Sequence, residues 1–323
     1  MQQYALAHKF SASRQLLMAL LLLATMATAQ VNPFKLESDS ETERVGNRLY
    51  QQAMALYRDG EYWSSSQQLI KLIDEFPGYS NMDGAVHTLA NCLYELGMSQ
   101  SAKKIYKHIV QKYITSPYVP EALVGLQRIE YEQNNLAASL KYYDALSRGT
   151  PSQDVFDLAA YYAGMAYYKM ENYPRCAQVL QRASPSSPYY DYILYTLAVS
   201  MLRMKQVYPA IDFFESLFHL PVINDERRHV LDEAHLTVGY LYYELEYFDK
   251  AIQEFQQISA GSTQHPHALL AWGWSAAQQN MWQDAIAPLT KLYTTYESND
   301  LAQEGLFLLG RCYLKLGRYD EAI

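Results

Sequence analysis

The stretch YYAGMAYYKMENYPRCAQVLQRASPSSP, at residues 161–188, contains a pattern that recurs along most of the chain. Two small residues, Gly164 and Cys176, lie twelve positions apart, and the large residue Leu180 follows the second of them. Residues three and four positions apart share one face of a helix, and Pro188 marks the end of the unit. The stretch therefore predicts two short amphipathic helices joined by a tight turn.

The most regular position of this pattern is the small residue that opens the second helix of each pair. It occurs eight times, with successive steps of 37, 37, 37, 34, 41, 34 and 37 residues. Small residues let two helix backbones approach closely, and large residues fill the groove beside them. The small second-helix residues are Ser65, Ala102, Ser139, Cys176, Ala210, Ala251, Ala285 and Ala322. The first-helix positions, twelve residues earlier, hold Ala53, Ala90, Gln127, Gly164, Ala198, Gly239, Gly273 and Gly310. The large residues, four positions after the second-helix ones, are Leu69, Tyr106, Tyr143, Leu180, Phe214, Phe255 and Leu289. Only Gln127 departs from the pattern, so the packing of the third pair is the least certain.

Two helices per unit, this period, and Gly-x-Tyr before the second helix at residues 60–62 and 317–319 resemble the tetratricopeptide repeat. The phrase YLKLGRYDEAI at 313–323 is close to the consensus of that family, and YYELEYFDKAI at 242–252 is nearly so. The resemblance covers residues 47–323 and implies an all-α fold, a right-handed α-solenoid of about eight repeats with the last one truncated. The longer steps, with Phe-Pro-Gly or Ser-Pro-Tyr before the next unit, are similar to a bacterial envelope variant that includes the Tol-Pal-associated cell-division coordinator and the outer-membrane-assembly proteins.

The first 29 residues have the three parts of a secretory signal peptide. Lys9 and Arg14 precede an apolar run at 16–24, and the A-x-A sequence at 27–29 predicts cleavage before Gln30. An uncleaved membrane anchor is the alternative, but a spanning helix needs about 20 apolar residues. No cysteine follows the cleavage site, unlike in the assembly lipoproteins. We therefore expect an exported protein, either periplasmic or secreted.

The two ends of the repeat region carry separate expectations. Residues 30–46 are polar and charged, which predicts a flexible lead-in that becomes helical around 41–43. The sequence stops at Ile323, inside the expected second helix of the eighth unit. Because terminal repeats normally carry a polar outer face, we expect the sequence to be a fragment of a longer reading frame.

Charge and motif content argue against several classes of function. The net charge is -8, and no cluster of Lys and Arg suits nucleic acid as the principal ligand. The three cysteines fall in separate repeats, which favours core packing over a disulfide or a metal site. The sequence lacks the phosphate-binding, dinucleotide-binding and H-E-x-x-H motifs. The His-Pro-His sequence at 265–267 is interpreted as a turn. We expect no enzymatic activity, no cofactor and no metal.

A row of aromatic residues on the first helices is the candidate binding site. The resemblance places first helices on the concave surface, so the tyrosines would form a ladder that holds an extended peptide. Aromatic anchors give a large contact area at a small entropic cost. The alternative is that these side chains pack between repeats. The ladder consists of Tyr57, Tyr94, Tyr131, Tyr168 and Tyr243, each four residues after the small first-helix position, and Tyr50, Tyr161, Tyr195 and Trp274 would widen it.

The sequence as a whole predicts a non-catalytic scaffold of the bacterial cell envelope. Its partner would be a protein or a peptide, with no nucleic acid, no small-molecule cofactor, and contact with a membrane only through an envelope complex. One alternative is that the repeats are the targeting or regulatory half of a longer protein, whose enzymatic domain lies beyond residue 323. Another is a self-assembling array that stacks end to end.

Overall fold

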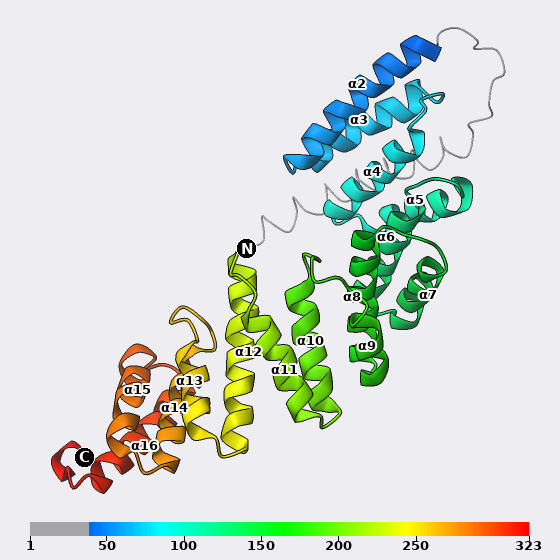
Figure 1. Ribbon diagram of the computed structural model, residues 1–323. Coiled ribbons are helices and arrows are strands. Elements are labelled where there is room, and N and C mark those ends of the chain that lie inside the picture. The colour runs from blue at the N-terminus through cyan, green and yellow to red at the C-terminus, as the bar shows by residue number, and fades with distance from the viewer. Residues whose placement is uncertain (1–38, 323) are drawn as a thin grey trace. The chain divides into compact units, whose positions relative to one another are not determined.

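The computed structural model describes residues 39–322, and within them all regular secondary structure is helical (Figure 1). The expected all-α solenoid class is therefore confirmed. The contacts divide the chain into two compact units, with the boundary after Pro151. The expected signal peptide, its cleavage site and the first part of the lead-in lie outside the described residues.

The first unit consists of three helix pairs in its described part. They are α2 (Asp39–Arg58) with α3 (Tyr62–Glu75), α4 (Met82–Glu95) with α5 (Ser99–Lys112), and α6 (Val119–Glu132) with α7 (Leu136–Ser147). The third pair packs as the first does. Gln127 is fully buried, and its backbone carbonyl oxygen accepts a hydrogen bond from Ser139 Oγ at 3.0 Å.

The second unit consists of four further pairs and a last helix. They are α8 (Gln153–Lys169) with α9 (Tyr173–Leu180), α10 (Tyr190–Arg203) with α11 (Val207–Phe218), α12 (Asp225–Glu244) with α13 (Phe248–Gln256), α14 (His265–Gln278) with α15 (Trp282–Thr295), and α16 (Asp300–Lys315), followed by the 3-10 turn η1 (Tyr319–Glu321). The His-Pro-His sequence expected as a turn instead begins α14, where proline suits the first helical turn.

The first helix begins earlier than the sequence predicted. Residues 39–46, placed in the flexible lead-in, are already part of α2, in line with the expected helical character around 41–43. Contacts of Glu43 help to fix this early part of α2. Its carboxylate accepts hydrogen bonds from the backbone N–H of Ser80 at 2.7 Å and from the Ser80 hydroxyl at 2.9 Å. The lead-in thus makes contacts with the loop before α4.

The register of the helix pairs is the predicted one. The small second-helix residues of the first seven pairs are all fully buried. Ser65 Oγ donates a hydrogen bond to the carbonyl oxygen of Ala53 at 2.7 Å, which joins the two small positions of the first pair directly. At Gly239 a Cβ atom would lie 2.4 Å from the Phe255 ring, so only glycine permits this approach. The twelve-residue spacing therefore corresponds to real contacts between helix backbones.

One backbone conformation recurs at every turn between the two helices of a pair. The residue seven positions after the small first-helix position has φ between 58° and 77°, and the residue after it donates its N–H to the carbonyl five positions earlier. This is the Schellman arrangement that ends a helix with a left-handed residue. The eight residues are Gly60, Gly97, Asn134, Glu171, Lys205, Glu246, Asn280 and Gly317. They repeat the steps of the sequence pattern, and all eight are exposed.

Consecutive first helices contact each other within each unit. In the first unit α2 packs against α4, and in the second unit α8, α10, α12, α14 and α16 follow one another in the same way. Each first helix also packs against its own second helix. As a result, the first helices provide a surface that continues from one repeat to the next, and this surface carries the candidate site.

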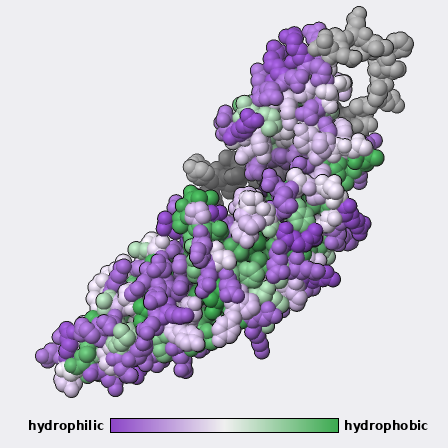
Figure 2. Space-filling view, in the orientation of Figure 1, coloured by the Kyte–Doolittle hydropathy of each residue, from purple (hydrophilic) through white to green (hydrophobic). Residues whose placement is uncertain are grey.

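The cores are apolar and contain the cysteines. Cys92, Cys176 and Cys312 are fully buried free thiols, which agrees with the core interpretation. Figure 2 shows a face on which hydrophilic residues predominate and hydrophobic residues gather in small groups. None of the described helices combines the length and the apolar character that crossing a membrane requires.

Candidate functional site

The five ladder tyrosines lie near the ends of first helices, and each is half-buried. Three of them make edge-to-face contacts with the aromatic residue five positions later, at the start of the second helix. The ring centres are 5.3 Å apart for Tyr57 and Tyr62, 5.5 Å for Tyr168 and Tyr173, and 5.4 Å for Tyr243 and Phe248. One side of each of these rings therefore stabilises its own helix pair.

The hydroxyl groups of two ladder residues, Tyr94 and Tyr243, reach the next repeat. Tyr94 donates to Glu132, and Tyr243 accepts from Gln278 Nε2 at 3.1 Å. Burial, together with the hydrogen bond to Glu132, raises the pKa of Tyr94 to about 12. These two residues thus link successive repeats, as the packing alternative expects, while each of the five rings keeps an accessible part.

Tyr94 also has a cation on its face. The guanidinium carbon of Arg128 lies 3.4 Å from the centre of the Tyr94 ring. The same guanidinium lies 3.5 Å from Glu95, the residue next to Tyr94 on α4. In the first unit, therefore, a Tyr-Glu pair on one first helix holds an arginine from the following first helix.

The residues expected to widen the ladder are packed to different degrees. Tyr161 stacks on Tyr189 with ring centres 5.4 Å apart, and Tyr195 contacts Phe214 edge to face at 5.9 Å. Burial raises the pKa of Tyr195. Trp274 differs because it lies in a groove, where its Nε1–H donates to Glu304 Oε1 at 2.9 Å.

This groove, the aromatic groove below, has a volume of about 500 Å³ and lies entirely in the second unit. Its lining comes from three consecutive first helices: Tyr240, Tyr243 and Glu244 on α12, Leu270, Ala271, Trp274 and Gln278 on α14, and Leu301 and Glu304 on α16. It brings together two residues that the sequence predicted, Tyr243 and Trp274. The other members of the predicted site are not among its lining residues.

Sequence reasoning missed most of the groove, although a periodic signal was available. Tyr240 and Trp274 each follow the small first-helix position directly, and Glu244 and Gln278 each lie five residues after it. Both pairs are 34 residues apart, which is the step between these two repeats. The aromatic residue directly after the small first-helix position therefore marks Tyr240 as well as Trp274.

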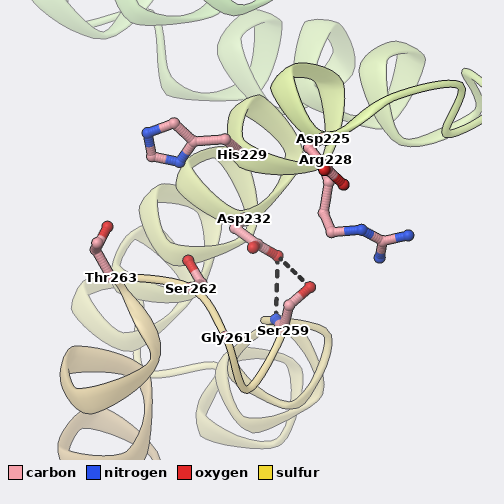
Figure 3. Close-up of a pocket in the computed structure, with 8 residues that line it drawn as sticks. All are labelled: Asp225, Arg228, His229, Asp232, Ser259, Gly261, Ser262 and Thr263. Carbon is pink, nitrogen blue, oxygen red and sulfur yellow. Dashed lines mark hydrogen bonds between the residues drawn. The ribbon is translucent and has the colours of Figure 1, made fainter.

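A second cavity, of about 520 Å³, lies between α12 and the loop that precedes α14 (Figure 3). Its lining mixes acidic and basic side chains, including Asp225 and Arg228. The buried Asp232 accepts hydrogen bonds from the Ser259 N–H at 3.1 Å and its hydroxyl at 3.2 Å. This carboxylate holds the loop in place, so its role is structural.

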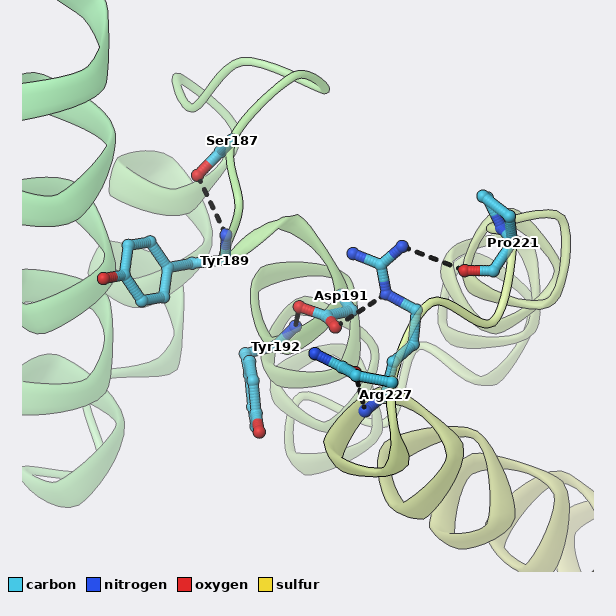
Figure 4. Close-up of polar contacts among 7 residues, drawn as sticks. Ser187, Tyr189, Asp191, Tyr192, Pro221 and Arg227 are labelled. Carbon is cyan, nitrogen blue, oxygen red and sulfur yellow. Dashed lines mark hydrogen bonds and ion pairs between the residues drawn. The ribbon is translucent and has the colours of Figure 1, made fainter. Parts of the chain in front are cut away.

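A buried ion pair fixes the long connection between α11 and α12 (Figure 4). Arg227 Nε donates to Asp191 Oδ2 at 2.9 Å, and the same guanidinium donates to the carbonyl oxygen of Pro221 at 3.0 Å. Helix α12 begins at Asp225, with Asn224 as its N-cap, so the connection after α11 ends at Asn224. The contacts of Arg227 therefore hold this connection against α10.

Two segments of the chain match family models of a known repeat. A family model described as tetratricopeptide repeat matches residues 270–323, and a second model with the same description matches residues 87–113. Among proteins of curated function, none matches the chain.

Solved structures with the same fold are similar to this chain. The C-terminal part of a TPR repeat-containing protein from Cytophaga hutchinsonii has a TM-score of 0.58 and 16% identity, covering 80% of this chain and 99% of that one. A tetratricopeptide repeat protein from Parabacteroides merdae has a TM-score of 0.50 and 14% identity, covering 82% and 99%. PilF of Pseudomonas aeruginosa has a TM-score of 0.50 and 18% identity, covering 69% and 95%. At these identities the similarity shows the fold alone.

Proposed function

Because the chain carries tetratricopeptide repeats, we propose that it is a non-catalytic scaffold that binds a partner protein or an extended peptide. Repeats of this kind present continuous surfaces for other proteins and are typically without chemistry of their own. The observation that supports the proposal is the aromatic groove, in which Tyr240, Tyr243 and Trp274 line one hollow across successive first helices.

The aromatic groove suits an extended segment better than a small molecule. Its lining spans three helices that follow one another along the unit, so a chain lying across them meets a new set of side chains at each repeat. Rigid aromatic rings supply contact area at low entropic cost. Within the second unit, the accessible part of the Tyr168 ring adds to this proposed surface, and Tyr57, Tyr94 and Tyr131 offer a separate one on the first unit.

Replacement of Trp274 by alanine is expected to weaken the binding of selected peptides at least tenfold. Truncating a central aromatic anchor typically costs about 2 kcal/mol or more, and about 1.4 kcal/mol corresponds to tenfold. The measurement begins with selection of decapeptides from a displayed random library on the purified full-length chain. Fluorescence anisotropy then gives Kd for the selected peptides with each variant.

The matched control is Tyr208→Ala. Tyr208 is a 69% exposed aromatic residue on α11, outside the aromatic groove, so its loss should leave Kd unchanged. Circular dichroism checks that both variants keep their helices. If no peptide is selected, or if the two variants bind alike, the proposed function is wrong.

We also propose that the scaffold works in the bacterial cell envelope. The support is the sequence of the first 29 residues, with its basic start, apolar run and A-x-A site. When the full chain is expressed in a bacterial host, N-terminal sequencing of the exported protein is expected to begin at Gln30. A chain retained in the cytoplasm with its first 29 residues intact would contradict this assignment.

A further inference from the structure

The chemistry of the aromatic groove indicates the charge of its ligand. Three aromatic residues, Tyr240, Tyr243 and Trp274, lie with two acidic ones, and none of the lining residues is basic. Leu270, Ala271 and Leu301 supply apolar surface. Aromatic faces and carboxylates both attract cations, whereas an acidic ligand would meet two like charges.

The three aromatic side chains of the groove are held in place by contacts with neighbouring helices. Glu304 Oε1 accepts the Trp274 Nε1–H at 2.9 Å, and Gln278 Nε2 donates to the Tyr243 hydroxyl at 3.1 Å. Tyr240 packs edge to face on the buried Phe255, with ring centres 5.5 Å apart, and remains 41% exposed. Burial and then the nearby Glu304 charge raise the pKa of Tyr240, which places that carboxylate within electrostatic reach of the ring. A ligand therefore meets a site that needs little rearrangement.

The first unit contains a filled version of the same arrangement. Tyr94 and Glu95 lie four and five residues after the small position of α4, just as Tyr243 and Glu244 do on α12. Arg128, one residue after the small position of the next first helix, stacks on Tyr94 at 3.4 Å and pairs with Glu95 at 3.5 Å.

The hydroxyl contacts of the two arrangements match as well. Tyr94 is hydrogen-bonded to Glu132 and Tyr243 to Gln278, and both partners lie five residues after the small position of the next repeat. In the second unit the position of Arg128 is taken by Trp274, which reaches Glu304 instead. The Tyr243–Glu244 pair therefore lines a cavity, and among residues 39–322 no arginine covers it as Arg128 covers Tyr94.

We propose that the aromatic groove binds a basic side chain, arginine above all, of the extended segment that the scaffold holds. A guanidinium is planar, so it stacks on an aromatic ring while donating to a carboxylate, which the ammonium of lysine does less well. Tyr240, Tyr243 and Trp274 surround the cation, and Glu244 and Glu304 neutralise it. The inference depends on the proposed scaffold function and names the chemical class of its ligand.

The test uses the decapeptides selected on the full-length chain. They are expected to be enriched in arginine. Synthetic copies in which one arginine is replaced by citrulline, which has nearly the same shape but no charge, should bind the native protein at least tenfold more weakly. The double variant Glu244→Gln, Glu304→Gln should lose a similar factor for the arginine peptide and show little further loss with citrulline. Glutamine keeps an acceptor for Trp274, so the groove retains its shape.

The control is Glu226→Gln, an exposed residue in the first turn of α12, about 20 Å along the helix from Tyr240. It should bind both peptides as the native protein does. Selected peptides without basic residues, or a citrulline effect of equal size in the native protein and the double variant, would overturn the inference while leaving the scaffold function intact. Selection of no peptide at all would reject the scaffold function itself.

Discussion

Replacement of Arg227 by alanine is expected to lower the free energy of unfolding by about 3 to 5 kcal/mol, because it leaves a buried carboxylate without its counter-charge. Arg227 is 8% exposed and Asp191 is 4% exposed. The guanidinium also donates to the Pro221 carbonyl oxygen, so the same change removes the contact that holds the long connection before α12. We expect this to be the most destabilising single change among those considered.

Urea unfolding followed by circular dichroism measures this effect. Arg228 provides a matched control, since it is the exposed neighbour of Arg227 on the same turn. Its replacement by alanine should change stability by no more than about 0.5 kcal/mol. Addition of Asp191→Asn to the Arg227→Ala variant should recover part of the loss, because the buried charge is then gone. Equal stability of the Arg227→Ala and Arg228→Ala variants would show that the ion pair does not support the fold.

Replacement of Gly239 by alanine is expected to destabilise the second unit by about 1 to 2 kcal/mol, even though alanine is the better helix former. The added Cβ would lie 2.4 Å from Phe255, whose rigid ring is 2% exposed. Overpacking of a core costs about 1 to 3 kcal/mol, and a rigid buried ring favours the upper part of that range, about 2 to 3 kcal/mol. Subtracting the gain in helix propensity of about 1 kcal/mol leaves the expected loss.

Gly310 is the matched control for this change. It occupies the same repeat position on α16, but the nearest atom to an added Cβ is the Ala322 carbonyl oxygen at an ordinary 3.5 Å. Gly310→Ala should therefore leave stability unchanged or raise it by up to about 1 kcal/mol. The two variants are compared by thermal unfolding, and a Gly239→Ala protein as stable as the native one would refute the close approach of α12 and α13.

Periodicity was sufficient to predict the helix pairs and their register. The contact between Ser65 and Ala53 joins two positions that the sequence selected only by their spacing. Gly239 and Phe255 were likewise selected by size and spacing, as a small residue and a large one that fills a groove, and they lie in contact. Both predictions succeeded because contacts within a repeat depend on residues close in sequence, and a fixed period repeats them.

The candidate site was less predictable because it lies between repeats. Trp274 was included for its aromatic character, but its partner Glu304 belongs to the next first helix, 30 residues later. The choice between a binding ladder and packing had no single answer, since Tyr243 uses one side of its ring and its hydroxyl for packing while it also lines the groove. Spacing within one helix does not show which face a neighbouring helix leaves open.

The same left-handed backbone conformation occurs at all eight turns between paired helices, although the side chain at that position differs from turn to turn. Only three of the eight turn residues are glycine, and Glu171, Lys205 and Glu246 place charged side chains in water at the same backbone conformation. A non-glycine residue in this conformation costs about 1 to 2 kcal/mol, which the packed helices on both sides tolerate. The turn residue of each repeat can therefore be acidic, basic or neutral, with no change in how the helices pack.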